Sequence, residues 1–444
     1  MSVMEEPMAE RSPAEQYLAE QHLAEQPQAR SGKLPMAGKI LVAVLLLCEA
    51  LACFVGAKPS LEGKVDLRPF YAAGAIVRSG QASRLYDYDY QRQVQDARVG
   101  PRAGALPFLY PPFAALLFVP LSLLPYREAF FVQVAVNLAL LFGASLLLRP
   151  WLPALGRRSR ALLPALYGCL FAVSVALMQG QISFVLLVLC CGSYALLRRG
   201  SSFLAGLVLS LALMKFQLAL PVFLLFLVWR RWRFVWGFVA GAGCAAGVSW
   251  AMVGRAGLAA YWRSLSGIAS QSAANAAAAK VRYGMLPSEM PNLHGLTYGL
   301  SHGAPWGQWL NVILCVLVLV WAARQSASML VALPAAMLVS YHMQPHDLIL
   351  LLLPLSFILD DVLGRMMGGV SATPSLPRSL GIALVCALLL LTFPLEPTLM
   401  AHGIHYFVAA AVGISMVLAA RRESSFAASV ASRGTPALRQ FQLQ

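Results

Sequence analysis

The sequence predicts an all-α protein, a polytopic bundle of transmembrane helices. Of its 444 residues, 59% are hydrophobic and only 12% are charged, whereas a soluble domain is roughly half apolar and about a quarter charged. Apolar runs of about 17–22 residues also recur along the chain, and each is long enough to cross a hydrocarbon core of about 30 Å. Composition and run length together place the protein in a membrane.

The apolar runs predict about twelve crossings, with both chain ends in the cytoplasm. The candidate spans lie at about 38–57, 127–148, 161–178, 182–197, 203–215, 217–229, 234–253, 305–323, 327–343, 348–363, 378–395 and 403–420. Short basic clusters such as "RRWR" (230–233) separate several of them, which is typical of cytoplasmic loops. The net charge of +15 is thus explained by topology, and nucleic acid is not expected as a partner.

One apolar segment does not fit a simple count. The stretch "FLYPPFAALLFVPLSLLP" (108–125) contains four prolines, which argue against a straight spanning helix. Counting it as a crossing would also place the arginines of 149–160 outside. We therefore expect a re-entrant or surface-lying segment on the external side, although thirteen or fourteen crossings are also compatible with the pattern.

The predicted crossings divide the chain into three regions. Residues 1–36 are expected to be a disordered cytoplasmic tail, because they contain the polar repeat "AEQYLAEQHLAEQPQ". Residues 37–422 form the membrane domain, and 423–444 form a second cytoplasmic tail. Two external loops, about 58–126 and 254–304, are then large. Function is expected there, because binding groups concentrate in loops held by a rigid scaffold.

Asp66 is the best-placed acidic residue in these loops. It comes soon after the first crossing and precedes "LRPFYAAGAIV", a segment that predicts an amphipathic helix lying on the membrane. One face of that helix is apolar or aromatic: Leu67, Phe70, Tyr71 and Ala75. Asp66 could serve as a helix N-cap, as a catalytic carboxylate, or as both.

Three other acidic residues have structural interpretations. Asp87 and Asp89 in "YDYDY" are interpreted as turn or helix-cap residues. Glu49 lies inside the first span, where an ionisable group is a functional candidate by default. We expect a protonated, hydrogen-bonded glutamate that faces the bundle. The eight cysteines show no CxxC spacing, so neither a disulfide framework nor a metal site is expected.

Polar residues also interrupt the apolar runs at two breaks on the predicted external side. Lys215 in "MKFQ" lies where two short spans meet, and it could extend to the membrane surface or hold a phosphate. In "YHMQPHDL", Pro345 lies between His342 and His346 and disfavours a helix that would pair them on a metal. These breaks favour a polar pocket for an amphiphile that carries a phosphate and a polar ring.

Several motifs together resemble glycosyltransferase family 87, integral-membrane enzymes of the GT-C superfamily. The motifs are "DLRPFYAAGAIVRSGQASRLYD", "LYPPFAALLFVPLSLLP", "LMKFQLALPVFLLFLVWRRWR", "MPNLHGL" and "YHMQPHDLILLLLPL". The resemblance extends from about residue 40 to 420. It implies a GT-C-like bundle, a polyprenyl-phosphate sugar donor, transfer on the extracytoplasmic face, and no metal or other cofactor.

The resemblance also implies roles for individual residues. Asp66 falls where the family has its general base. The residues implied to bind the donor or another substrate are Arg68, Tyr71, Lys215, Gln217, Asn292, His294, His342 and His346. Two positions depart from the family pattern, because Phe216 replaces a proline and His294 replaces an arginine. A histidine is only partly protonated near neutral pH, so His294 does not supply the constant positive charge of an arginine.

The implied function is transfer of a hexose, by family analogy mannose, from polyprenyl phosphate to a glycolipid or glycan in the bacterial inner membrane. A phosphate leaving group needs cationic stabilisation rather than a general acid, so one carboxylate suffices, and inversion is expected. Two alternatives stay open. One is a lipid or solute transporter, which usually carries internal repeats that this chain does not show. The other is a relative that has lost activity.

Overall fold

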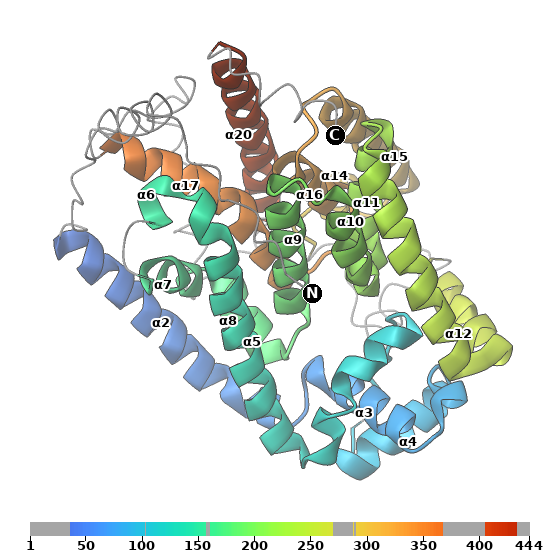
Figure 1. Ribbon diagram of the computed structural model, residues 1–444. Coiled ribbons are helices and arrows are strands. Elements are labelled where there is room, and N and C mark those ends of the chain that lie inside the picture. Colours follow the sequence, from blue (N-terminus) through green and yellow to red (C-terminus); the bar gives the residue numbers. More distant parts are fainter. Residues whose placement is uncertain are drawn as a thin grey trace, which may run out of the picture.

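The described part of the chain is helical throughout. The computed structural model describes residues 36–102, 104–156, 160–269, 287, 290–366 and 405–432, and within these ranges every regular element is a helix (Figure 1). The all-α prediction is confirmed. The tail before residue 36, the candidate span 378–395 and the end of the chain after 432 lie outside the described residues, as does much of the loop 254–304.

Among the described residues, five helical segments are long and apolar enough to cross a membrane. They are Met36–Leu61 (α2), Tyr126–Trp151 (α5, Tyr126–Leu148, with η4, Arg149–Trp151), Ser202–Val228 (α10, Ser202–Ser210, η5, Leu211–Lys215, and α11, Phe216–Val228), Trp232–Ser266 (in α12, Trp232–Ala269) and Pro305–Ala323 (α15). A bent pair, α7 (Leu162–Gly168) and α8 (Phe171–Gln179), would make a sixth. The expected number of about twelve crossings stays a prediction.

The segment from α10 to α11 folds back on itself. Gly206 of α10 packs so closely on α12 that a side chain there would meet the Phe234 carbonyl. Phe226 of α11 reaches the same residue, with ring centroids 4.0 Å apart. Roughly twenty residues of straight helix would separate the two arms by about 30 Å, so α10 and α11 must form a hairpin. Lys215, at the junction, has non-helical backbone angles (φ −119°, ψ 70°), as two short spans meeting there predict.

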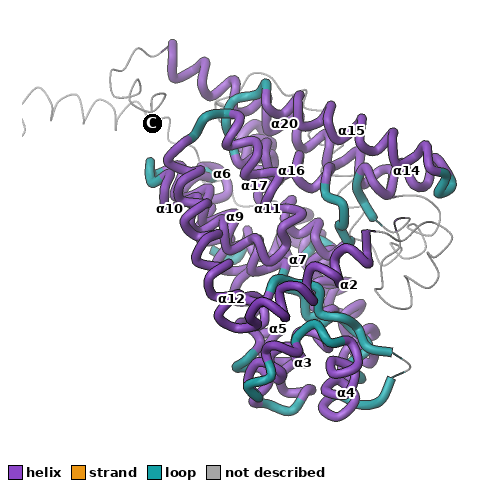
Figure 2. Tube along the Cα trace, turned by 90° about the vertical axis from the view of Figure 1, so that its right-hand side faces the viewer, coloured by secondary structure: helices purple, strands orange, loops and turns teal. Residues whose placement is uncertain are grey.

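The first loop forms a compact helical layer at one end of the molecule, shown at the bottom of Figure 2. The predicted helix is present as α3 (Leu67–Arg78), but the prediction that it lies on the membrane surface is wrong. Its residues from Leu67 to Ile76 are all buried, because α4 (Tyr88–Arg98) and the segment after it pack around it. The rings of Phe70 and Phe118 stack at 4.7 Å.

The proline-rich segment lies against α3 and contains no spanning helix. It forms two short 3-10 helices, η2 (Pro112–Phe118) and η3 (Leu121–Leu123), as its prolines predict. Gly74 of α3 allows the close approach, because a side chain at that position would collide with the Phe118 carbonyl. Asp87 caps α4 by accepting a hydrogen bond from the Tyr90 backbone N–H at 3.1 Å, so its interpretation as a cap is confirmed.

Helix α2 packs along α8 and delivers the chain to Asp66. Glu49 faces the bundle, as predicted: it is 4% exposed and its Oε2 accepts a hydrogen bond from the Ser174 hydroxyl at 2.5 Å. Nearer the end of α2, the Ser60 hydroxyl donates to the Met178 carbonyl at 2.8 Å. These contacts fix the point at which the chain enters the first loop.

The remaining helices complete the bundle. They are η1 (Ala82–Arg84), α6 (Pro153–Gly156), α9 (Ser183–Arg198), α14 (Leu293–Ser301), α16 (Met329–Val339), η8 (Pro345–Leu351), α17 (Leu352–Met366) and α20 (His405–Ser432). Helix α16 lies in the core between α11, α15 and α20, and its residues are buried from Met329 to Leu338. Helix α20 continues past residue 422, the predicted end of the membrane domain.

Candidate active site

Asp66 lies at the N-terminus of α3 but does not cap it, since its side chain makes no capping hydrogen bond. Its carboxylate Oδ2 instead accepts a hydrogen bond from Gln181 Nε2 at 2.5 Å. Its backbone N–H donates to Gln179 Oε1 at 3.3 Å. The side chain is half-buried. Of the two sequence interpretations, the structure therefore does not support a helix cap.

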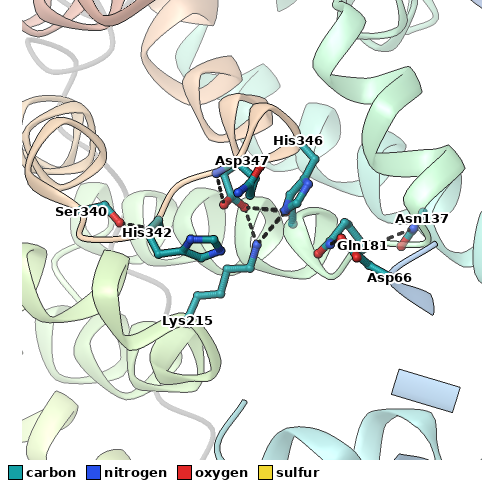
Figure 3. Close-up of polar contacts among 10 residues, drawn as sticks. Asp66, Asn137, Gln181, Lys215, Ser340, His342, His346 and Asp347 are labelled. Atoms are coloured by element: carbon teal, nitrogen blue, oxygen red, sulfur yellow. Dashed lines mark hydrogen bonds and ion pairs between the residues drawn. The ribbon is translucent and has the colours of Figure 1, made fainter. Parts of the chain in front are cut away.

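A second polar group forms around Lys215, at the apex of the α10–α11 hairpin (Figure 3). Its Nζ donates to Asp347 Oδ1 at 2.5 Å and lies 3.3 Å from His346 Nε2. The Ser183 hydroxyl donates to the same carboxylate oxygen at 2.8 Å. Lys215 and Asp347 are only 3% and 1% exposed. This is a buried ion pair, which is stable only when further hydrogen bonds satisfy its members.

The break between α16 and η8 positions this carboxylate. Gln344 and Asp347 form a capping box at the start of η8, and Pro345 occupies the first turn, where a proline costs no hydrogen bond. The Gln344 backbone N–H donates to Asp347 Oδ2 at 3.3 Å. The motif "MQPHD" thus forms the start of η8 and directs Asp347 and His346 toward Lys215.

The two carboxylates have opposite electrostatic surroundings. Burial raises the pKa of Asp66, and the Gln181 hydrogen bond and the Lys215 charge oppose that rise only in part. Burial alone would also raise the pKa of Asp347, but the charge and hydrogen bond of Lys215, with His346 and Ser183, hold it well below its usual range. Asp347 therefore stays ionised, whereas Asp66 takes up a proton more readily than an ordinary aspartate.

The two histidines of this break are neutral near neutral pH. Burial lowers the pKa of His342 to about 4 and that of His346 to about 3. Because an ammonium only donates, His346 Nε2 must accept from Lys215, which places the imidazole proton on Nδ1. Each ring can therefore offer one hydrogen-bond donor and one acceptor.

Two predicted substrate-binding residues lie away from this cluster. The Arg68 guanidinium is fully buried and donates to Gln95 Oε1 at 3.1 Å, to Asp96 Oδ1 at 2.9 Å and to the Gly100 carbonyl. The Tyr71 hydroxyl donates to the Leu124 carbonyl at 2.7 Å. Both side chains hold the first loop together, so the structure gives them packing contacts rather than positions beside Asp66.

Three further predicted residues make no hydrogen bond to the cluster around Asp66 and Lys215. Asn292 caps α14, and its Nδ2 donates to the Ser340 carbonyl at 2.7 Å. His294 Nδ1 lies 2.8 Å from the Tyr341 carbonyl. These contacts support the backbone leading to His342. Gln217 is half-buried and has no hydrogen bond to the described residues. Of the predicted residues, Asp66, Lys215, His342 and His346 gather here.

The sequence-based assignment omitted four residues that belong to the cluster. Asp347 lies in "YHMQPHDL", where it was assigned no role, and Gln181 lies in "GQIS" (180–183), between two of the predicted spans. Ser183 lies two residues after Gln181. Tyr110 is half-buried in the first loop, and burial raises its pKa, with the negative charges of Asp347 and Asp66 adding to that rise. Their assembly depends on tertiary packing of segments far apart in the chain.

Three polar atoms around the cluster are buried without a hydrogen-bond partner among the described residues: Gln181 Oε1, His342 Nδ1 and Gln344 Nε2. Buried polar atoms are nearly always paired in a working state. They therefore indicate where a polar ligand would bind. Within the described ranges, no group of three or more His, Cys, Asp or Glu side chains is arranged to hold a metal ion, and the expectation of a metal-free reaction stays a prediction.

The sequence profile of glycosyltransferase family 87 matches residues 108–354, which is more than half of the chain. The chain belongs to glycosyltransferase family 87. The matched region contains Lys215 and the His342–Asp347 break. Asp66 lies before it, so its assignment within this family member depends on the geometry described above.

Curated relatives share only part of their length with this family 87 chain. It is 31% identical over 230 residues to the polyprenol-phosphate-mannose-dependent alpha-(1-2)-phosphatidylinositol pentamannoside mannosyltransferase of Mycolicibacterium smegmatis, over 50% of this chain and 52% of that protein. It is 34% identical over 123 residues to the protein of the same name from Mycobacterium tuberculosis, over 26% of each chain. The chain thus spans about half or less of these relatives. No solved structure matches it.

Proposed function

We propose that this protein is a membrane mannosyltransferase that moves mannose from polyprenyl phosphate to a hydroxyl of a glycolipid or glycan, with inversion. The observation that carries the proposal is one half-buried carboxylate, Asp66, beside a buried lysine and two neutral histidines, in a family 87 chain. The names of the relatives support the donor and the sugar, and they suggest a phosphatidylinositol mannoside as acceptor.

Asp66 is suited to act as the general base. Its Oδ2 is held by Gln181, whereas its Oδ1 has no hydrogen bond to the described residues. An acceptor hydroxyl that donates to Oδ1 would lose its proton to Asp66 as its oxygen bonds to the anomeric carbon. The bond from that carbon to the phosphate oxygen breaks on the opposite side, which gives inversion. The raised pKa makes Asp66 a stronger base than an ordinary aspartate.

Lys215 is suited to stabilise the leaving phosphate. Negative charge on the phosphate grows as the glycosidic bond breaks, so a fixed cation stabilises the transition state more than the bound donor. Asp347 fixes the ammonium from one side. A phosphate would bind where Lys215 now donates to His346. The neutral imidazole, released from that bond, could carry its proton on Nε2 and donate it to the same phosphate. No separate general acid is required.

The position of the basic clusters supports an extracytoplasmic site. Helix α9 begins at Ser183, which contacts Asp347, and ends at Arg198. Helix α11 begins beside Lys215 and ends before Arg230. Because arginine clusters favour the cytoplasmic side, the opposite helix ends, which carry the cluster, are proposed to face the outside of the inner membrane.

A reconstitution experiment tests the proposal. Purified protein in liposomes would receive polyprenyl-phosphate-[¹⁴C]mannose and phosphatidylinositol mannosides, and mass spectrometry would follow the acceptor. We expect a single hexose increment that depends on protein and donor. Movement of a fluorescent polyprenyl phosphate across the bilayer with no glycosylated product from any polyprenyl-phosphate hexose would instead identify a transporter and overturn the proposal.

A further inference from the structure

Gln181 stands out among the cluster residues because only one end of its amide is used. It lies in the turn between α8 and α9 and is 2% exposed. Its Nε2 donates to Asp66 Oδ2, while its Oε1 is buried with no partner among the described residues. An ionised carboxylate can only accept hydrogen bonds, so the –NH₂ end must face Asp66 and the carbonyl end must face the orphaned position.

The turn holds this side chain in place from several directions. Gly180 ends α8 in a left-handed conformation (φ +62°), and a side chain there would collide with Leu67, the residue after Asp66. The Gln181 backbone carbonyl accepts a hydrogen bond from Asn137 Nδ2 at 3.2 Å. Asn137 is itself fully buried and accepts from Gln133 at 3.1 Å. These contacts fix the backbone that carries the Gln181 amide.

We propose that Gln181 both positions the Asp66 carboxylate and recognises a sugar hydroxyl, with Nε2 on Asp66 and Oε1 accepting a hydrogen bond from that hydroxyl. This inference rests on the proposed transferase function. A buried acceptor oxygen needs a donor, and an ionised phosphate or carboxylate has none. Sugar hydroxyls donate, and the attacking hydroxyl at Asp66 has neighbours on the same ring. A hydroxyl of the donor or acceptor sugar is therefore the ligand group that fits.

Besides the Gln181 amide, several charged and titratable groups affect the pKa of Asp66. Lys215 and Arg102 favour its ionised form, and Asp347 disfavours it, while the phenols of Tyr110 and Tyr126 feel its charge. These groups remain when Gln181 is replaced. A hydrogen bond to the ionised form lowers a carboxyl pKa, so removal of the Gln181 amide raises the pKa of Asp66 further.

The first test compares pH profiles of Gln181→Leu, Gln181→Asn and wild type in the mannosyl transfer assay. We expect Gln181→Leu to lower kcat/KM by about 10- to 100-fold and to move the acidic limb of its pH profile to higher pH. Gln181→Asn keeps an amide and should recover part of the rate and of the shift. Gln325→Leu removes a half-buried glutamine just after α15, whose Nε2 donates to the Trp321 carbonyl at 3.2 Å, and serves as the matched control.

The second test varies the substrate. Monodeoxy versions of the mannosyl donor and of a mannoside acceptor would be offered to wild type and Gln181→Leu. Removal of one particular hydroxyl should lower kcat/KM of the wild type about tenfold or more and leave kcat/KM of Gln181→Leu unchanged. If that hydroxyl belongs to the donor series, Gln181 binds the donor sugar, and if it belongs to the acceptor series, Gln181 binds the acceptor sugar. Equal discrimination by both enzymes at every position would overturn hydroxyl recognition, since a bound water would then satisfy Oε1.

The outcomes separate this inference from the proposed function. If wild type forms no glycosylated product, the transferase proposal fails. If wild type is active and Gln181→Leu keeps both its rate and its acidic limb, only the role of Gln181 fails. If Gln181→Leu does not fold, as judged by gel filtration in detergent, the positioning role is tested with Gln181→Asn alone. An acidic limb of its pH profile that is unchanged from wild type overturns that role.

Discussion

Asp66 and Asp347 contribute to one polar cluster from two different segments, and their surroundings differ in every respect that matters for chemistry. Asp66 is half-buried, is held by one neutral amide and has a raised pKa. Asp347 is fully buried, accepts from a lysine, a hydroxyl and a backbone N–H, and has a lowered pKa. One oxygen of Asp66 is still free to accept a proton. The acceptor positions of Asp347 are occupied.

The difference shows how identical side chains come to have different roles. A carboxylate whose pKa is raised can take a proton during a reaction, whereas one that is tightly paired organises its partner. We therefore interpret Asp66 as the reacting group and Asp347 as the support that fixes Lys215. The following substitutions test that division, from the largest expected effect to the smallest.

Asp66→Asn should abolish most of the mannosyl transfer, with a loss of about 10³-fold in kcat, because general-base catalysis contributes roughly 10²–10⁴-fold. Folding should be unaffected, since Asp66 caps no helix and asparagine can still accept from Gln181. The measurement is initial rate with polyprenyl-phosphate mannose together with the thermal midpoint. Asp89→Asn, at an exposed first-loop aspartate, is the control. Near-wild-type turnover by Asp66→Asn would eliminate Asp66 as the base.

Lys215→Met should instead reduce both activity and stability. It leaves Asp347 charged, buried and without its cation, a change that typically costs about 3–5 kcal/mol. The double variant Lys215→Met, Asp347→Leu removes both charges and should recover much of the stability while staying inactive. Denaturation in detergent checks stability, and the transfer assay checks activity. Additive losses in the double variant would show that the pair is not coupled.

The residues used in this comparison were predictable from the sequence to different degrees. Asp66 and Lys215 lie at breaks between apolar runs, and the break alone indicates that the polar group does not face lipid. The surroundings of Arg68 were not predictable, because a sequence does not show that Gln95, Asp96 and Gly100 surround its guanidinium. The helix α3 was predictable from its periodicity, but the layer that buries it depends on contacts with residues about 20–50 positions away.

The same limit explains the residues that were missed. Gln181 matters because Asn137 and Asp66, both distant in sequence, meet at its turn. The amide has no period, charge or spacing that would mark it. The hairpin of α10 and α11, in contrast, was predictable, because Lys215 interrupts a run that is too long for one short span and is followed by an arginine cluster.

Activity should fall in acid because Asp66 must be ionised to accept a proton. Its pKa is raised above the ordinary aspartate value of 3.8, so the acidic limb of kcat/KM should lie above that value, with a loss of about tenfold per pH unit below it. Asp347 has a lowered pKa and stays ionised across this window. A limb at or below 3.8 would contradict the environment described for Asp66.

The histidines provide a separate acid effect on stability. Burial lowers the folded pKa of His342 to about 4 and that of His346 to about 3, below the ordinary histidine value of 6.5. Between these values the unfolded chain binds more protons, so stability falls as the pH drops below about 6.5. The contribution of the Lys215–Asp347 ion pair to the stability of the folded protein is lost only below about pH 4. Rates should therefore be measured directly after a pH change and again after return to neutral pH, because only the reversible loss reports Asp66.

Glu49 is a third carboxyl and should give the smallest effect. It is about as buried as Lys215 and His346 of the cluster, but it lies within α2, and its Oε2 accepts a hydrogen bond from the Ser174 hydroxyl. Glu49→Gln keeps that acceptor and replaces an oxygen that has no partner among the described residues, so activity should stay within about twofold and stability within about 0.5 kcal/mol. Glu49→Leu leaves the Ser174 hydroxyl without its acceptor and should cost about 1 kcal/mol. A tenfold loss of transfer activity in Glu49→Gln, with stability unchanged, would show that a buried carboxyl beside one hydroxyl also takes part in the reaction. The contrast between Asp66 and Asp347 would then not explain which carboxylate acts as the base.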